Sequence, residues 1–385
     1  MFADRTNWNL ESNRLSEALA KHRAASKPLL DLTVSNPTEC GFVYDRGSIL
    51  QSLANPHSLS YDPDPKGLLA ARQAVAGYYL AHDIVVPVEN IILTTSTSEA
   101  YSFTFRILCN PGDEVLIPEP GYPLFSFLAN IHDVKLVSYP LLYDHGWQID
   151  FHALQQVITP RTRGVIIVNP NNPTGHFCKA YEMRKVNEIC SSRQIAIIAD
   201  EVFLDFYFEA KRPSSFAANN TNLTFTMSGL SKIAGLPQMK AAWLITTGPE
   251  ELKAPALSRL EVIADTFLSM NAPVQLAIPR FLELRHGFQN QLMTRVRRNL
   301  AKLDAQLAAQ SSCSRLEVEG GWYAVLRVPA TRSDEDLAIE LLNTQEIYVH
   351  PGHFYDFPTD GYLIVSLITP AEEFDEGMKR LLWAF

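Results

Sequence analysis

The sequence lacks the features that mark membrane, secreted and nucleic-acid-binding proteins. Its longest apolar stretches, such as 164–168 and 195–199, have the length of strands and fall far short of a membrane span. Lysine and arginine form no cluster and the net charge is -9, so we expect no nucleic-acid partner and no membrane partner. Residues 1–6 lack the basic start and apolar core of a secretory signal.

Motifs built from cysteine and glycine are also missing. The five cysteines are odd in number and widely spread, and none forms a CxxC or a Cys/His zinc spacing. This pattern indicates reduced thiols in a cytoplasmic protein without a metal site. None of the 18 glycines takes part in a Gly-x-Gly motif and no P-loop occurs, so the sequence does not favour a nicotinamide dehydrogenase or a P-loop enzyme.

The chain does contain repeated units of a short apolar strand, a polar loop and a helix. The expected strands and the polar loops after them are 91–93 with 94–98, 164–168 with 169–175, and 195–199 with 200–201, and a further strand at 114–117 leads into a loop rich in proline and glycine. Strands that are apolar on both faces and alternate with helices predict an α/β fold with a mostly parallel sheet covered on both sides. Ligands of such sheets bind at the carboxyl ends of the strands, which is where these polar clusters lie.

The sequence also predicts how the chain divides into domains. Helices are expected over 7–27 and 65–79, and from about 271 the pattern changes to a long helix over 281–310, a strand over 322–328 and a helix over 334–342. A chain of 385 residues is too long for one small core. We therefore predict an N-terminal segment (1–44) that packs with a small C-terminal α+β domain (271–385), and a large domain between them (45–270).

Two charged residues follow apolar strands and have a chemical interpretation. Lys232 lies in a tight turn of small and hydroxyl residues between the expected strands 223–227 and 241–246. Partial loss of water around such an amine lowers its pKa and makes it able to bind an aldehyde such as pyridoxal phosphate (PLP). Asp200 ends an apolar strand, so its buried carboxylate needs a partner, and a protonated pyridine nitrogen is one. A solvated surface lysine and a turn-capping aspartate are the alternatives.

Three further segments contain candidate contacts to a cofactor. Thr97 and Ser98 lie where a strand turns into a helix that starts near Glu99, and such a turn suits a phosphate group, although a plain helix cap is the commoner interpretation. Asn172 stands in a loop between two prolines, where its amide is able to donate to a phenolic oxygen or a carboxylate, or simply to form a turn. Tyr122 is able to stack on an aromatic ring or to pack in the core.

Together these residues resemble the fold-type I PLP-dependent enzymes, and among them the class I/II aminotransferase family. The resemblance covers about 32–382, and its motifs occur in the order and with the spacing of the family. They are Tyr61 with Gly67-Leu68, the run 94–100, Pro111-Gly112-Asp113-Glu114-Val115 with Pro120-Gly121-Tyr122-Pro123, Asn169-Pro170-Asn171-Asn172-Pro173-Thr174-Gly175, Asp200-Glu201-Val202, Ser231-Lys232 and Gly320-Gly321-Trp322-Tyr323.

The resemblance implies the PLP-dependent transferase fold of type I, with a mostly parallel sheet of the seven-stranded type. It implies that Lys232 forms the aldimine with PLP and shuttles the proton, and that the reaction passes through pyridoxamine phosphate. It further implies a homodimer with shared sites, an amino donor and a keto acceptor. The other implied contacts to PLP are Asp200 at the pyridinium, Asn172 at the ring oxygen, Tyr122 stacked on the ring, Thr97, Ser98, Ser231 and Lys240 at the phosphate, and Tyr61 from the neighbouring subunit.

The sequence departs from the family pattern at three positions. Phe203 replaces a tyrosine that donates to the ring oxygen, and Lys240 replaces a phosphate-binding arginine with a cation that lacks the two-pronged geometry. Ile364 replaces the arginine that binds the substrate's α-carboxylate, a contact of the stronger charge-assisted kind. Arg327 is one candidate replacement, although an exposed strand residue is its simpler interpretation. His350 and His353, in a loop that the family places near the site, are not included among the site residues.

The departure at Ile364 leaves other reactions open. A PLP-dependent lyase that catalyses carbon–sulfur β-elimination, or a decarboxylase, would use the same lysine and aspartate. A non-catalytic relative of the same fold is the remaining alternative, and it gives no reason for keeping both Lys232 and Asp200.

Overall fold

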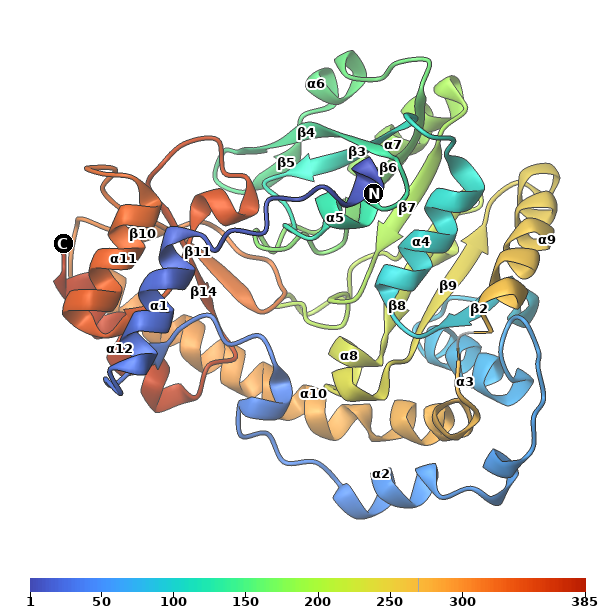
Figure 1. Cartoon of the computed structure of the whole chain (residues 1–385), viewed down its shortest axis with the longest axis horizontal. Coiled ribbons are helices and arrows are strands. Elements are labelled where there is room, and N and C mark those ends of the chain that lie inside the picture. The colour runs from blue at the N-terminus through green and yellow to red at the C-terminus, as the bar shows by residue number, and fades with distance from the viewer. Residues whose placement is uncertain (269) are drawn as a thin grey trace.

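The largest element of the protein is a sheet with helices on both faces. Its strands are β2 (Ile91–Thr94), β3 (Glu114–Glu119), β4 (Lys135–Tyr143), β5 (Trp147–Ile149), β6 (Thr162–Val168), β7 (Ala196–Asp200), β8 (Thr224–Gly229) and β9 (Ala242–Thr247). In the computed structural model, which describes residues 1–268 and 270–385, these eight strands have the order β2-β9-β8-β7-β6-β3-β4-β5 (Figure 1). β9 is antiparallel to β2 and β8, and β5 to β4, whereas the other neighbours are parallel. The predicted mostly parallel sheet is confirmed, with β5 as a short additional edge strand.

Successive side chains of a strand point to opposite faces of the sheet, and here both faces are covered by helices. The helices that surround it are α2 (Arg46–Leu53), α3 (Leu69–Leu80), α4 (Thr97–Leu108), α5 (Phe125–Asn130), α6 (Phe151–Gln156), α7 (Ala180–Arg193), α9 (Glu250–Phe267) and α10 (Ala272–Leu307). Ile91 and Leu93 of β2 pack in a cluster with α3 and α10, whereas Ile92 between them packs with α4 and α9. Central strands that must fill two cores in this way need an unbroken apolar sequence.

The end of the chain forms a smaller α+β unit together with the N-terminal segment. Its elements are α1 (Arg14–Ala24), β1 (Leu30–Asp31), β10 (Ser314–Arg315), β11 (Tyr323–Arg327), α11 (Asp334–Gln345), β12 (Ile347–Tyr348), β13 (His350–Pro351), β14 (Tyr362–Ser366) and α12 (Ala371–Trp383). An antiparallel sheet has the order β10-β11-β14-β13, and β1 pairs in parallel with β12. Arg14 of α1 forms an ion pair with Asp336 of α11 at 2.7 Å. The domain boundaries at 44 and 270 stay predictions.

Several helices differ in their bounds from the sequence prediction, and the largest differences are at α10 and α1. α10 begins at Ala272 rather than near 281 and continues through Pro279, because one lost N–H bond is offset by the burial of Ile278 and Phe281 on either side. α1 begins only at Arg14, where the side chain of Asn13 accepts a hydrogen bond from the Ser16 amide and caps the helix.

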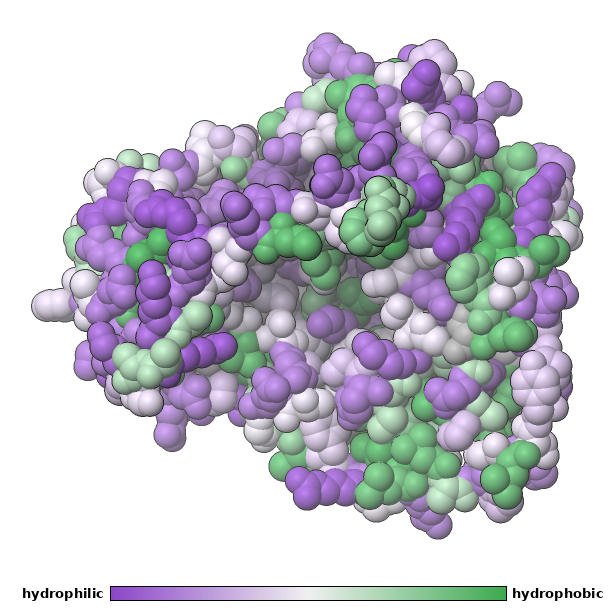
Figure 2. All heavy atoms as spheres, in the orientation of Figure 1, coloured by the Kyte–Doolittle hydropathy of each residue, from purple (hydrophilic) through white to green (hydrophobic). Residues whose placement is uncertain are grey.

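The residues before α1 cross from the small unit to the large one. In Figure 1 this N-terminal chain passes in front of the molecule and reaches the neighbourhood of α5. Trp8 lies edge-on to Phe127 with 5.8 Å between ring centroids, and Arg5 forms an ion pair with Asp133 at 2.8 Å. On the same face, Figure 2 shows a hollow between the lobe that contains α1, α11 and α12 and the lobe of the large sheet. Within residues 1–268 and 270–385, every helix is too short or too polar to cross a bilayer.

Candidate active site

Lys232 lies on a short helix between two central strands. β8 ends at Gly229, the helix α8 (Leu230–Ile233) follows at once, and β9 returns beside it. Gly229 is required here because a Cβ at this position would lie 2.8 Å from the Cβ of Ala242 on β9. The predicted tight turn is therefore one turn of helix, and it holds Lys232 at the carboxyl end of β8.

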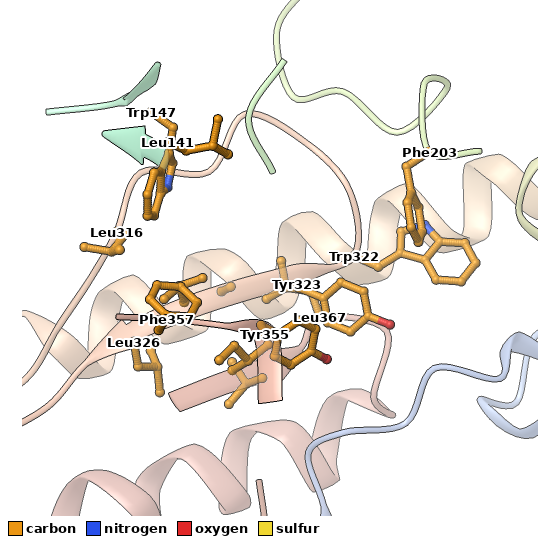
Figure 3. Close-up of a cluster of buried hydrophobic side chains, with 14 of the residues drawn as sticks. Leu141, Trp147, Phe203, Leu316, Trp322, Tyr323, Leu326, Tyr355, Phe357 and Leu367 are labelled. Carbon is orange, nitrogen blue, oxygen red and sulfur yellow. The ribbon is translucent and has the colours of Figure 1, made fainter. Parts of the chain in front are cut away.

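Aromatic rings surround the amine of Lys232. Its Nζ lies 4.9 Å from the ring centroid of Trp322 and 5.4 Å from that of Phe203, and Figure 3 shows these two rings side by side. Burial lowers the pKa of Lys232 to about 8, and among the described residues Asp200 is the one charge that opposes this. A larger fraction of the amine is therefore unprotonated near neutral pH than for an ordinary lysine, as a reaction with an aldehyde requires.

Asp200 is the last residue of β7 and is 9 % exposed. Its Oδ1 accepts a hydrogen bond from the Val202 amide at 3.2 Å, and its Oδ2 accepts one from the Tyr101 hydroxyl at 3.1 Å. Burial raises the pKa of Asp200 to about 6, while these two donors and the charge of Lys232 lower it. A carboxylate has about four acceptor positions, so this one keeps capacity for another donor, and a protonated ring nitrogen fits it.

Asn172 and Tyr122 lie in loops that follow neighbouring strands. Asn172 follows β6 and is 8 % exposed; its Oδ1 has no hydrogen-bond donor among the described residues, and the NH₂ group of the same amide is the donor that a ring oxygen would need. Tyr122 follows β3, is 38 % exposed and lies edge-on to Phe125 at 5.7 Å. Burial and, to a smaller extent, the charge of Asp200 raise the pKa of Tyr122.

Thr97 and Ser98, the residues expected to contact the phosphate, lie in the first turn of α4. Ser96, rather than Ser98, caps this helix: its Oγ accepts a hydrogen bond from the Glu99 amide at 3.1 Å. The helix thus starts at Thr97, two residues before the predicted start, and Thr97 and Ser98 fill its first two positions. The amides at this end are unpaired within the helix and carry its positive dipole, which suits a phosphate.

The other three residues expected at the phosphate, Ser231, Lys240 and Tyr61, lie in different parts of the structure. Ser231 precedes Lys232 within α8. Lys240 ends the helical turn Pro237–Met239 in a left-handed conformation (φ 50°), with an exposed side chain. The structure does not bring Tyr61 to this group: its side chain is 80 % exposed and lines another cavity of about 320 Å³, whose lining includes none of the other candidate residues.

Two of the three departures from the family pattern, Phe203 and Ile364, are well packed, whereas the side chain of Lys240 is exposed. Phe203 lies edge-on to Trp322 at 5.1 Å, and Ile364 is 1 % exposed in β14, paired with Val325 of β11 and His350 of β13. Arg327 is exposed at the end of β11, with its guanidinium about 6 Å from the ring of Tyr362.

Sequence reasoning missed some residues of the site. Tyr101 contacts Asp200 from α4, four residues after Thr97 and hence on the same side of that helix, and this spacing was its only signal. His350 is not among the predicted site residues, but burial lowers its pKa and its Nδ1 lies 3.1 Å from the hydroxyl of Tyr355. Figure 3 shows Tyr355 next to Tyr323.

The fold and these residues together define a PLP-dependent enzyme of fold type I. The lysine and the aspartate lie at the carboxyl ends of adjacent parallel strands, with an unmet amide oxygen and an open helix start nearby. The residues present therefore fit the cofactor.

Comparison with known proteins gives the family. The model of the family described as aminotransferase class I and II matches residues 49–381, so the chain belongs to this family. It is 29 % identical over 381 residues to an alanine aminotransferase of Mycobacterium tuberculosis, covering 94 % of this chain and 86 % of the relative. It is 28 % identical over 374 residues to the glutamate-pyruvate aminotransferase AlaA of Escherichia coli, covering 94 % and 91 %.

Solved structures agree with this assignment. An Escherichia coli aminotransferase matches with a TM-score of 0.86 and 25 % identity, covering 99 % of this chain and 96 % of that one. An alanine aminotransferase from Pyrococcus furiosus matches with a TM-score of 0.89 at 20 % identity, covering 99 % and 98 %, which shows the shared fold. The protein is thus a PLP-dependent aminotransferase, and the comparisons give the lyase alternative no support.

Proposed function

We propose that this aminotransferase moves the amino group of a small α-amino acid, with alanine as the first candidate, to a 2-oxo acid. The names of its curated relatives support this choice of substrates. The observation that carries the proposal is the pair of Lys232 and Asp200, an amine of lowered pKa and a buried carboxylate on adjacent strands.

Each residue of the site has a proposed task. PLP, when bound, supplies an electron sink for negative charge at the substrate's α-carbon. Lys232 would hold the cofactor covalently and, once displaced by the substrate amine, would move the proton between the substrate's α-carbon and C4′ of the cofactor. Asp200 keeps the ring nitrogen protonated, Asn172 donates to the ring oxygen and Tyr122 stacks on the ring. Thr97, Ser98, Ser231 and Lys240 bind the phosphate.

The substrate carboxylate is proposed to be bound by neutral groups. Ile364 provides no charge, and Arg327 is turned towards the rings of Tyr143 and Tyr362. Burial raises the pKa of Tyr122, Tyr323 and Tyr355, with smaller contributions from Asp200 at Tyr122 and from neighbouring tyrosines at the other two, so all three remain protonated donors at neutral pH. Hydrogen bonds from neutral donors to a carboxylate are weaker than a two-pronged arginine contact.

A single-turnover experiment tests the reaction type. PLP-loaded enzyme mixed with alanine, without an acceptor, is expected to release one pyruvate per active site and to lose the visible absorbance of its cofactor. Addition of 2-oxoglutarate should restore the absorbance and produce glutamate. A lyase would instead release ammonia and keep turning over without an acceptor, and that result would overturn the proposal.

The same experiment with alaninamide tests the neutral carboxylate site. Loss of a charge-assisted contact costs about 1.5–3 kcal/mol, so an enzyme with an arginine would discriminate by about 10- to 150-fold. We expect kcat/KM for alaninamide to lie within about tenfold of that for alanine, because the proposed site holds no cationic side chain whose contact with the carboxylate would be lost. Discrimination of about 100-fold or more would show that a cation from elsewhere, for example from a second subunit, binds the carboxylate.

We also propose that the enzyme is a cytoplasmic homodimer in which Tyr61 reaches the phosphate in the partner's site. The exposure of Tyr61 and its distance from the other candidates in the chain's own layout support this assignment. Tyr61→Ala should weaken PLP binding by about tenfold, the effect of one hydrogen bond to a charged group. The exposed Tyr181 provides the control, since Tyr181→Ala should leave PLP affinity unchanged.

Mixed dimers separate a shared site from a site within one chain. When Tyr61→Ala and Lys232→Ala subunits are refolded together, each mixed dimer contains one site with neither substitution. At limiting PLP, activity should therefore recover to about a quarter of that of the wild type. No recovery in dimers shown to be mixed would mean that Tyr61 acts within its own subunit or not at all.

A further inference from the structure

Tyr101 joins the helix that carries the phosphate contacts to the carboxylate that faces the cofactor ring. It is 2 % exposed, and its hydroxyl donates to Asp200 Oδ2 at 3.1 Å. Its ring is fixed edge-on against Phe125 at 5.3 Å and tilted against Phe105 at 5.9 Å. Burial and the neighbouring Asp200 charge raise the pKa of Tyr101 well above its ordinary value, so the phenol remains a donor at every pH at which the enzyme works.

We propose that Tyr101 is a positioning residue, which holds Asp200 in the orientation that meets the ring nitrogen of PLP and couples that contact to the phosphate-binding turn of α4. This inference rests on the proposed roles of Asp200, Thr97 and Ser98. With the Val202 amide on Oδ1 and Tyr101 on Oδ2, rotation of the carboxylate would break two hydrogen bonds. Because Thr97, Ser98 and Tyr101 share α4, the two ends of the cofactor are gripped by parts of one rigid helix.

The charges around Asp200 determine what removal of the hydroxyl does. The groups that act on it are the Val202 amide, the Tyr101 hydroxyl from α4 and the charge of Lys232 from α8, and its own charge raises the pKa of Tyr122 in the loop after β3. The adjacent Glu201 is bonded elsewhere, to Ser215 and the Phe216 amide. Without the Tyr101 hydroxyl, the ionised form of Asp200 loses a donor, so its pKa rises and it takes up a proton at higher pH.

The test compares Tyr101→Phe with Tyr139→Phe in the PLP-loaded enzyme. Tyr139 is also buried (1 % exposed) and donates its hydroxyl to the Ile166 carbonyl at 2.7 Å, so this control loses a buried hydrogen bond away from Asp200. Tyr101→Phe should move the acidic limb of the kcat/KM profile to higher pH by about one unit and weaken PLP binding by about tenfold. Tyr139→Phe should change neither quantity, even if it lowers the Tm.

A second variant keeps the packing in case Tyr101→Phe folds poorly. Incorporation of 3,5-difluorotyrosine at position 101 makes the phenol a stronger donor, and the acidic limb should then move to lower pH. An unchanged limb in both position-101 variants, or an equal shift in Tyr139→Phe, would overturn the positioning role. That failure is distinct from failure of the proposed function, in which the wild-type enzyme itself would bind no PLP or transfer no amino group.

Discussion

Replacement of Lys232 by alanine is expected to lower kcat by about 10⁴-fold or more, because one side chain both binds the cofactor covalently and moves the proton. The substitution should leave the fold intact, since the amine only lies over the rings of Phe203 and Trp322. The direct measurement is borohydride reduction of the PLP-loaded enzyme followed by peptide mass mapping. The wild type should carry the cofactor on the peptide that contains Lys232, and the variant should carry none.

Lys185→Ala provides the matched control for this experiment. Lys185 lies on the outer surface of α7 in an ion pair with Glu188, so its loss should change neither kcat nor the labelled peptide. Labelling at Lys240 in the wild type, or full activity of Lys232→Ala, would show that the site is built around a different amine. Added methylamine should partly restore proton transfer in Lys232→Ala if the amine itself is the base.

The residues that the sequence identified share one property. Asp200 ends the apolar strand β7, Asn172 follows the apolar strand β6 and Lys232 follows β8, and parallel strands bring their carboxyl ends to one edge of the sheet. The unbroken apolar sequence of β2, β6 and β7 likewise made the mostly parallel sheet predictable, because strands buried on both faces leave little room for polar residues. Local sequence was sufficient to predict which residues lie together wherever they stand at the ends of neighbouring parallel strands.

The residues that the sequence did not identify depend on contacts between distant segments. Tyr101 looks like one more apolar residue of an amphipathic helix until α4 is packed against β7, 99 residues further along the chain. The start of α4 was misplaced because Ser96, Thr97 and Ser98 are all acceptable caps, and only the Ser96–Glu99 hydrogen bond decides among them. No pattern in the sequence reports that His350 is covered by the side chains of Phe354 and Tyr355.

Asp200→Asn is expected to lower kcat by about 10³-fold, because an amide of the same shape no longer stabilises a positive charge on the ring nitrogen. In the protein without PLP, the same substitution should raise the free energy of unfolding at pH 7. The folded pKa of Asp200 is raised to about 6 from an ordinary 3.8, so its contribution to stability is full below pH 4 and is lost as the pH rises through 6. At pH 7 this burial costs up to about 3 kcal/mol, which the neutral amide avoids. Urea unfolding of the apoprotein between pH 4 and 7 should show a smaller decline for Asp200→Asn than for the wild type.

Glu201→Gln separates this role from the general cost of changing a buried acid. Glu201 is the next residue, and burial raises its pKa to about 7, but its carboxylate accepts hydrogen bonds from Ser215 and the Phe216 amide instead of facing the site. The glutamine amide would meet these donors with one acceptor oxygen fewer, a loss that opposes the gain from replacing a buried acid of raised pKa, and Glu201→Gln should leave kcat of the folded enzyme nearly unchanged. Equal losses of kcat in Asp200→Asn and Glu201→Gln would mean that any change to a buried acid at the end of β7 disturbs the site, and that the charge of Asp200 has no special role. A large loss confined to Asp200→Asn, with an apoprotein at least as stable as the wild type, would place the function of this carboxylate in its charge, because the fold would then be shown to form without it.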